Sequence, residues 1–94
     1  MKLDQIADIL AKQIGAKREG AALLMPAEMD VTLFVALPGE TLAVSKIIRV
    51  EIAEPMLVCD TSRGDRVVFL ADDVRAVRGE KGDGARRDRS AGFR

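Results

Sequence analysis

Hydrophobic and polar residues alternate through residues 41–53, a stretch that contains neither Gly nor Pro. The apolar positions of one parity are Leu42, Val44, Ile48, Val50 and Ile52. The opposite parity carries the polar residues Thr41, Ser45, Arg49 and Glu51. A period of two predicts a strand with one face toward the core and one toward solvent. Lys46 interrupts the apolar parity, so we expect this long strand to bend there and to serve two sheets, as in small barrels.

The N-terminal residues 3–14 have the spacing of an amphipathic helix. One stripe, at intervals of three and four, is formed by Leu3, Ile6, Ala7, Leu10 and Ile14. Gly15 is a natural end for this helix. A helix this short is marginal alone, so its stripe is expected to dock on another surface. Ile9 lies off the stripe, which indicates a second contact.

Shorter strands are predicted on both sides of the long one. Residues 20–25 form a small apolar run that is consistent with a short edge strand. Residues 30–37 predict a firmer strand, and Phe34 makes its second face apolar too, which indicates burial on both faces. Pro38-Gly39 fits the centre of a type II turn that joins this strand to the long one as a hairpin.

Tight turns separate the remaining strands. The expected order is a strand at residues 56–60, a polar hairpin loop at 61–64, a strand at 66–71, a turn or short helical turn at Asp72-Asp73, and a closing strand at 74–77. Val67 and Phe69 alternate with Val68 and Leu70 along the strand that follows the loop.

The chain of 94 residues is long enough for one domain with one core. We expect an N-terminal helix at residues 1–18, a small β-barrel at 20–78 and a disordered tail at 79–94, which is rich in Gly and charge. The fold class is mainly β (α+β). We expect the amphipathic helix to precede a five- or six-stranded antiparallel, strongly bent sheet that resembles an SH3/Sm-like small barrel.

The segments VTLFVALPGETLAVSKIIRVEI, MLVCDT and RVVFLADDVRAV carry this order of elements. Their pattern resembles the Sm-like (Hfq-type) small β-barrel, over residues 30–77 and the leading helix. The resemblance implies the fold and, as an alternative function, an Sm-like RNA-binding ring. The Hfq-type signature places an aromatic residue, Lys and His where this chain reads Phe69-Leu70-Ala71. No RNA-binding residue is therefore carried over from the family.

Composition disfavours an enzyme. The chain has no His, Tyr or Trp, and His is the usual acid, base and metal ligand near neutral pH. Asp72-Asp73 is the only adjacent pair of carboxylates, and neighbouring residues of a strand point to opposite faces, so we interpret the pair as a turn. Cys59 has no His to act as its base and is read as a buried small hydrophobe. We expect no catalytic residue, cofactor or metal.

Charge and localisation signals are weak. The chain has 15 basic and 15 acidic residues, and the segment through Arg78 has ten basic against twelve acidic, which is a poor start for binding phosphate. A single Cys fits a reducing compartment. Asp4 and Asp8 lie where a signal peptide would be apolar. We expect a cytoplasmic protein that does not bind membranes.

These observations favour a non-enzymatic β-barrel module that self-associates or docks on a protein partner, with a homo-oligomer expected. The candidate protein-interaction residues are Leu3, Ile6, Ile9, Leu10, Ile14 and Phe34. For the alternative, a nucleic-acid surface, the candidates are Arg49, Arg63, Arg66, Arg75 and Arg78. Whether the helix packs within the chain or between chains stays open at this point, as does the clustering of the arginines.

Overall fold

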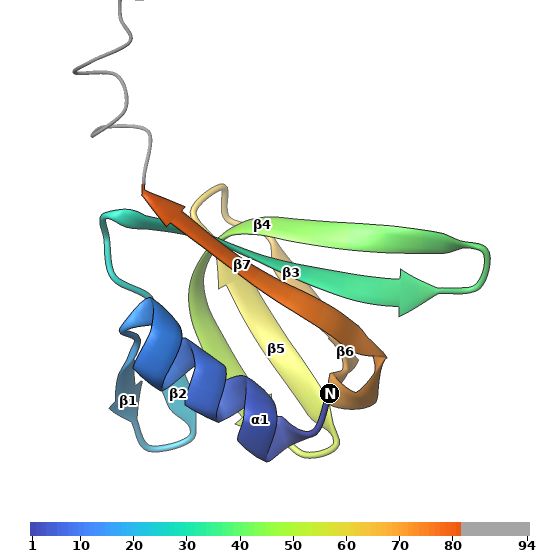
Figure 1. The fold of residues 1–94 in the computed structure, drawn as a ribbon, viewed down its shortest axis with the longest axis horizontal. Helices are drawn as coiled ribbons and strands as arrows, with labels where there is room; N and C mark the ends of the chain where they lie inside the picture. The colour runs from blue at the N-terminus through green and yellow to red at the C-terminus, as the bar shows by residue number, and fades with distance from the viewer. Residues whose placement is uncertain (82–94) are drawn as a thin grey trace, which may run out of the picture.

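The fold consists of one N-terminal helix followed by a strongly curled antiparallel sheet, which forms a half-barrel (Figure 1). The computed structural model describes residues 1–81. The elements are α1 (Leu3–Asp8), η1 (Ile9–Ile14), β1 (Lys17–Glu19), β2 (Ala22–Leu24), β3 (Met29–Leu37), β4 (Glu40–Ala53), β5 (Met56–Thr61), β6 (Arg66–Leu70), η2 (Ala71–Asp73) and β7 (Val74–Lys81). The predicted fold class is confirmed, with seven strands in place of five or six.

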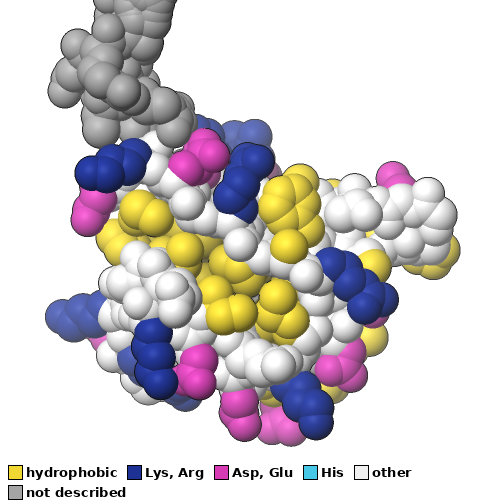
Figure 2. Space-filling model, viewed as in Figure 1, with side chains coloured by type: hydrophobic (Ala, Val, Ile, Leu, Met, Phe, Trp, Pro, Cys, Tyr) yellow, Lys and Arg dark blue, Asp and Glu magenta, His cyan; other side chains and the backbone are white. Residues whose placement is uncertain are grey.

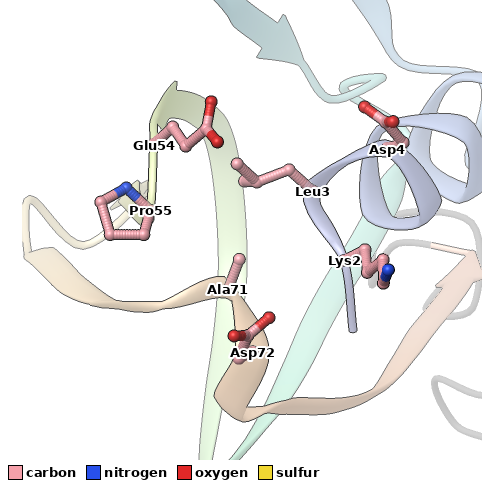
Figure 3. Close-up of a pocket in the computed structure, with 7 residues that line it drawn as sticks. All are labelled: Lys2, Leu3, Asp4, Glu54, Pro55, Ala71 and Asp72. Atoms are coloured by element: carbon pink, nitrogen blue, oxygen red, sulfur yellow. The ribbon is translucent and has the colours of Figure 1, made fainter.

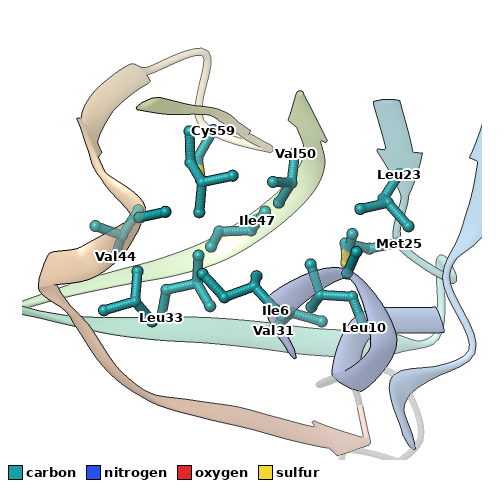
Figure 4. Close-up of a cluster of buried hydrophobic side chains, with 14 of the residues drawn as sticks. Ile6, Leu10, Leu23, Met25, Val31, Leu33, Val44, Ile47, Val50 and Cys59 are labelled. Atoms are coloured by element: carbon teal, nitrogen blue, oxygen red, sulfur yellow. The ribbon is translucent and has the colours of Figure 1, made fainter. Parts of the chain in front are cut away.

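The helix plugs the open side of the half-barrel. Its α-helical first part, α1, continues into the π-helical η1, which ends at Gly15 with φ 90°. Only glycine takes up that left-handed conformation at no steric cost, which is why the helix stops there. Ile6 and Leu10 point into the interior (Figure 4) and are fully buried. The predicted helix is confirmed, and its stripe packs within the chain.

Strand β4 is the centre of the sheet. The main path of the sheet is β1-β2-β4-β3-β7, and β5 joins β4 while β6 joins β5. The first half of β4 pairs with β3, and its second half lies between β2 and β5. The expected bend is confirmed, but β4 does not serve two sheets as expected, because the strands on either side of the bend belong to one seven-stranded sheet.

Lys46 is the point at which β4 breaks its regular pairing. Its φ is 59°, a left-handed value that a non-glycine residue rarely adopts. Across the β3–β4 ladder, Val31 pairs with Ile47 and Leu33 with Val44, so three steps on β4 oppose two on β3. The extra residue is a β-bulge, which bends the strand and increases its twist. The break in the apolar pattern at Lys46, seen in the sequence, is therefore caused by this β-bulge.

A second bulge follows directly. Opposite β5, Ile47 pairs with Thr61 and Arg49 with Asp60, so Ile48 is an extra residue on β4. With two extra residues, the buried positions of β4 are three apart, at Val44, Ile47 and Val50. Ile48 is 49% exposed. The expected alternation was therefore wrong at Ile48, because the bulges turn Ile47 toward the core in its place.

The bounds of individual elements also differ from those expected. Strand β1 was not predicted, because Lys17–Glu19 is wholly polar and pairs only with β2. Ala71–Asp73 forms a short 3-10 turn, the helical form of the expected turn. Strand β7 continues past residue 78 to Lys81, because the start of β3 extends the ladder as far as the Met29–Lys81 pair. The rest of the predicted tail lies outside the described residues.

The core lies between the helix and the inner face of the curled sheet (Figure 4). The largest fully buried side chains are Ile6, Leu10, Leu23, Val31, Leu33, Val35, Ile47, Val50, Leu57, Cys59 and Val74. They come from the helix and from all strands except β1 and β6. Strand β6 contributes Phe69, which is buried but not fully. Burial of this apolar surface is the main favourable contribution to folding.

Candidate interaction surface

The apolar stripe of the helix packs largely against the core of its own chain. Ile6 and Leu10 are 1% and 0% exposed, and the structure leaves Leu3, Ile9 and Ile14 half-buried. Seen from one side, hydrophobic side chains gather between α1 and β7, ringed by charges of both signs (Figure 2). The half-buried stripe residues Leu3 and Ile14 pack against the core cluster.

Phe34 lies on the outer face of the sheet rather than in the core. It is half-buried, and its neighbours across β4 and β7 are Ala43 and Ala76. The Arg78 guanidinium lies 5.7 Å from the ring centroid, within the range of a cation–π contact. The predicted second apolar face of β3 is thus one aromatic ring among small residues, partly covered by an arginine.

Four of the five candidate arginines contact carboxylates. Arg49 and Arg66 converge on Asp60, with Arg66 Nε 2.7 Å from Oδ1 and Arg49 Nη1 3.5 Å from Oδ2. Arg63 lies 4.0 Å from Asp65, and Arg78 lies 3.5 Å from Glu80. The structure therefore brings Arg49 and Arg66 together, but as part of a charge-balanced network on β4, β5 and β6. Such pairing weakens the positive potential that a nucleic acid needs.

Asp60 is the centre of that network. The hydrogen bonds that Arg66 donates to it hold the pKa of this carboxyl below its ordinary value of 3.8, and the charges of Arg66 and Arg49 act in the same direction. Glu51 completes the group, because Arg49 Nη1 lies 3.1 Å from its Oε1. These ion pairs are partly exposed, so their contribution to stability is small.

The outer face of β5 and β6 beside this network is apolar. Met56 pairs with Leu70, and Val58 pairs with Val68, so four apolar side chains stand together on one face. Val68 is 51% exposed and Leu70 is 43% exposed, whereas Met56 and Val58 are half-buried. We call these four residues the β6 face. A cluster of exposed apolar side chains rimmed by polar groups is typical of a protein contact.

The β6 face also borders an open edge of the sheet. Among the described strands, β6 pairs only with β5, so its other side has no strand beside it. An open edge offers backbone N–H and C=O groups to another chain, and apolar residues there promote such pairing. The sequence shows the signal for this site, since Val67 and Phe69 alternate with the equally apolar Val68 and Leu70. Sequence reasoning attributed no partner to it.

A pocket between the start of α1, the β4–β5 turn and η2 offers no comparable site (Figure 3). Its volume is about 470 Å³. Its lining is Lys2, Leu3, Asp4, Glu54, Pro55, Ala71 and Asp72. The carboxylates of Asp4, Glu54 and Asp72 point in different directions in Figure 3. Within residues 1–81 no group of three or more His, Cys, Asp or Glu is placed to hold a metal ion.

Cys59 is buried in the core, as the sequence suggested. Burial raises the pKa of its thiol to about 12, and the neighbouring charge of Asp60 adds to the shift. A thiol with so high a pKa is almost entirely protonated at neutral pH and is a poor nucleophile.

Comparisons with protein-family models, with curated proteins and with solved structures find no match to this chain. None of the described helices has the length and apolar character required to span a membrane.

Proposed function

We propose that the protein is a small, non-enzymatic assembly module that contacts other protein through the β6 face. One observation carries this proposal. Val68 and Leu70 are about half exposed, lie beside each other on one strand, and border the open edge of the sheet. Removing such side chains from water on contact with a partner is favourable by about 25 cal/mol per Å² of apolar surface.

The surroundings of the β6 face support the same reading. The ion-pair network lies next to it, with Asp60 and Arg66 on β5 and β6 and Arg49 on the adjoining β4. An apolar centre with a charged, hydrogen-bonded border is the usual organisation of a protein interface. The helix stripe, which the sequence favoured as the contact surface, supports the fold instead through Ile6 and Leu10.

The test compares the wild-type protein with Val68→Lys. This substitution places a charge on the β6 face but leaves the core untouched, because the side chain points outward. Light scattering over a wide range of concentration and pull-downs with tagged bait should both show association that Val68→Lys abolishes. Leu42→Lys is the matched control, since Leu42 is a similarly exposed apolar residue, at 38%, on the projecting β3–β4 hairpin. The proposal would be contradicted if the wild-type protein were a monomer and if wild type, Val68→Lys and Leu42→Lys all captured the same proteins.

An Sm-like RNA-binding ring stays an alternative prediction, and the paired arginines weaken it. Its test uses the absence of Trp and Tyr, which makes the pure protein absorb only weakly in the near ultraviolet. Co-purifying RNA would dominate the spectrum, and its binding would weaken steeply with salt. A spectrum with only the weak bands of Phe would rule out tightly retained RNA.

A further inference from the structure

We propose that the occupant of the β6 edge is a second copy of this chain, with the two β6 strands paired antiparallel about a two-fold axis at Val68. This inference rests on the proposed function, because it uses the β6 face as the contact. It adds the identity of the partner, the symmetry of the complex and the register of the strands.

The distribution of charge singles out β6 among the strands at the ends of the described sheet. Strand β1 consists of Lys17, Arg18 and Glu19, so every residue is charged. Strand β7 carries charged residues at half of its eight positions, which are Arg75, Arg78, Glu80 and Lys81. Charged residues on an edge are a common defence against pairing with another chain. Strand β6 reads Arg-Val-Val-Phe-Leu and has a single charge at its start.

The hydrogen bonds at both ends of the β5–β6 ladder show which backbone groups of β6 face outward. Thr61 N–H donates to the Asp65 carbonyl at 2.9 Å, and Ala71 N–H donates to the Pro55 carbonyl at 3.1 Å. Hydrogen-bonded and non-hydrogen-bonded pairs alternate along an antiparallel ladder. Val67 and Phe69 therefore direct their N–H and C=O groups at β5. The intervening Arg66, Val68 and Leu70 direct theirs at the open edge.

The outward-facing groups fix the best symmetric register. When Val68 faces Val68 of the second copy, Arg66 of each chain faces Leu70 of the other. All three outward-facing residues then form hydrogen-bonded pairs, and the whole of β6 is used. A two-fold axis at Val67 or Phe69 leaves one outward-facing residue of β6 beyond the end of the partner strand. The register centred on Val68 is therefore favoured.

Charges at the two ends of β6 agree with the antiparallel direction. The loop before β6 and its first residue carry Arg63, Asp65 and Arg66, so this end keeps one more basic than acidic residue, whereas the turn after β6 carries Asp72 and Asp73. An antiparallel pair places the arginine end of one copy beside the aspartate end of the other, and it does so twice. Such complementarity favours this direction and suppresses the parallel one.

Cysteine cross-linking tests the register. In the proposed pair the Cα atoms of the two Val68 residues are about 5.5 Å apart, and their Cβ atoms, about 5.5 Å apart in a hydrogen-bonded pair, lie beyond the roughly 3.5–4.5 Å of a direct disulfide. A short bifunctional thiol reagent should therefore convert Val68→Cys into a covalent dimer. Leu70→Cys is the matched control, because two Leu70 residues would lie about 13 Å apart along the strands. A mixture of Arg66→Cys and Leu70→Cys proteins should cross-link. Wild type controls for the buried Cys59.

Three results would overturn the inference. One is an association that Val68→Lys abolishes but that gives no Val68→Cys cross-link, as expected for β6 pairing with a different strand. Another is efficient cross-linking of Leu70→Cys alone. The third is a monomer at every concentration that still captures another protein through Val68. In the first and third cases the proposed function survives and the two-fold pairing does not, so the two failures are distinguishable.

Discussion

Asp30 contacts both the backbone and the side chain of Lys46, at the bend of β4. The Lys46 N–H donates to Asp30 Oδ1 at 3.3 Å, and its ammonium lies 3.2 Å from Oδ2. From β5 and its loop, the Ser62 N–H donates to the Lys46 carbonyl at 2.9 Å. These contacts hold Lys46 in its left-handed conformation, whose cost is of order 1 kcal/mol.

Replacing Asp30 by Ala should therefore destabilise the fold through the bend. The loss of one hydrogen bond and one partly buried ion pair predicts a decrease of about 1–2 kcal/mol in the free energy of unfolding. Urea unfolding followed by circular dichroism measures this decrease. The control is Glu28→Ala, which removes an exposed carboxylate two residues away. Equal stability of the two variants would show that the Asp30 contacts do not support the bend.

Leu10 provides a test of the helix. Because it is 0% exposed, Leu10→Ala should lower the free energy of unfolding by about 2–5 kcal/mol. Leu10→Asp should prevent folding, since it buries an unpaired charge. Although the sequence made Leu10 a candidate contact residue, its burial means that the substitution acts on the fold. Ala11→Asp, at an exposed position of the same helix, is the control. A folded but monomeric Leu10→Asp protein would contradict this prediction.

Asp60 predicts a loss of stability in acid. Its pKa is lowered in the folded protein, mainly by the hydrogen bond with Arg66. The ionised carboxylate is therefore favoured by folding above the ordinary pKa of 3.8, and this contribution is lost as pH falls through the lower, folded value. Asp60→Asn should flatten the dependence of the urea midpoint on pH below about pH 4. Identical acid profiles for both proteins would contradict this role.

Cys59 predicts the opposite behaviour in alkali. The pKa of its thiol is raised from 9.0 to about 12, so the folded protein favours the neutral thiol. Above the unfolded pKa the unfolded chain gains a thiolate, and stability falls as pH rises toward the folded value. The thiol should also react slowly with a disulfide reagent until the protein is unfolded. Cys59→Ala should remove the alkaline part of the pH dependence, and fast reaction of the folded protein would contradict the burial.

The local elements could be predicted because their signals are local. The helix stripe, Gly15 and the Pro38-Gly39 turn act over a few residues, and Gly39 indeed has a positive φ of 78°. The inward turn of Ile47 could not be predicted, because it depends on the pairing of β4 with β3 and β5 at once. The sequence shows that Lys46 breaks the alternation of apolar and polar residues. The number of extra residues in β4 depends on how it pairs with β3 and β5.

The candidate site was harder to predict for a related reason. Both faces of β6 are apolar, and only the order of strands reveals that one of them lies at an open edge. The helix stripe looked available for a partner because its dock, the open side of the half-barrel, is made by residues far along the chain, such as Val31 and Ile47. Exposure is a property of the assembled sheet, whereas the stripe is visible in the helix alone.

The two bulges of β4 make the curvature of the sheet adjustable by changes in chain length. The bend is set by the count of residues between Val44 and Val50, which is larger than the facing strands require. Deleting one residue at Lys46 would restore plain alternation between Val44 and the residue now numbered Ile47, and the strand would straighten. The opening of the half-barrel, and with it the space that the helix fills, is thus adjustable by single-residue deletions or insertions without altering any core side chain.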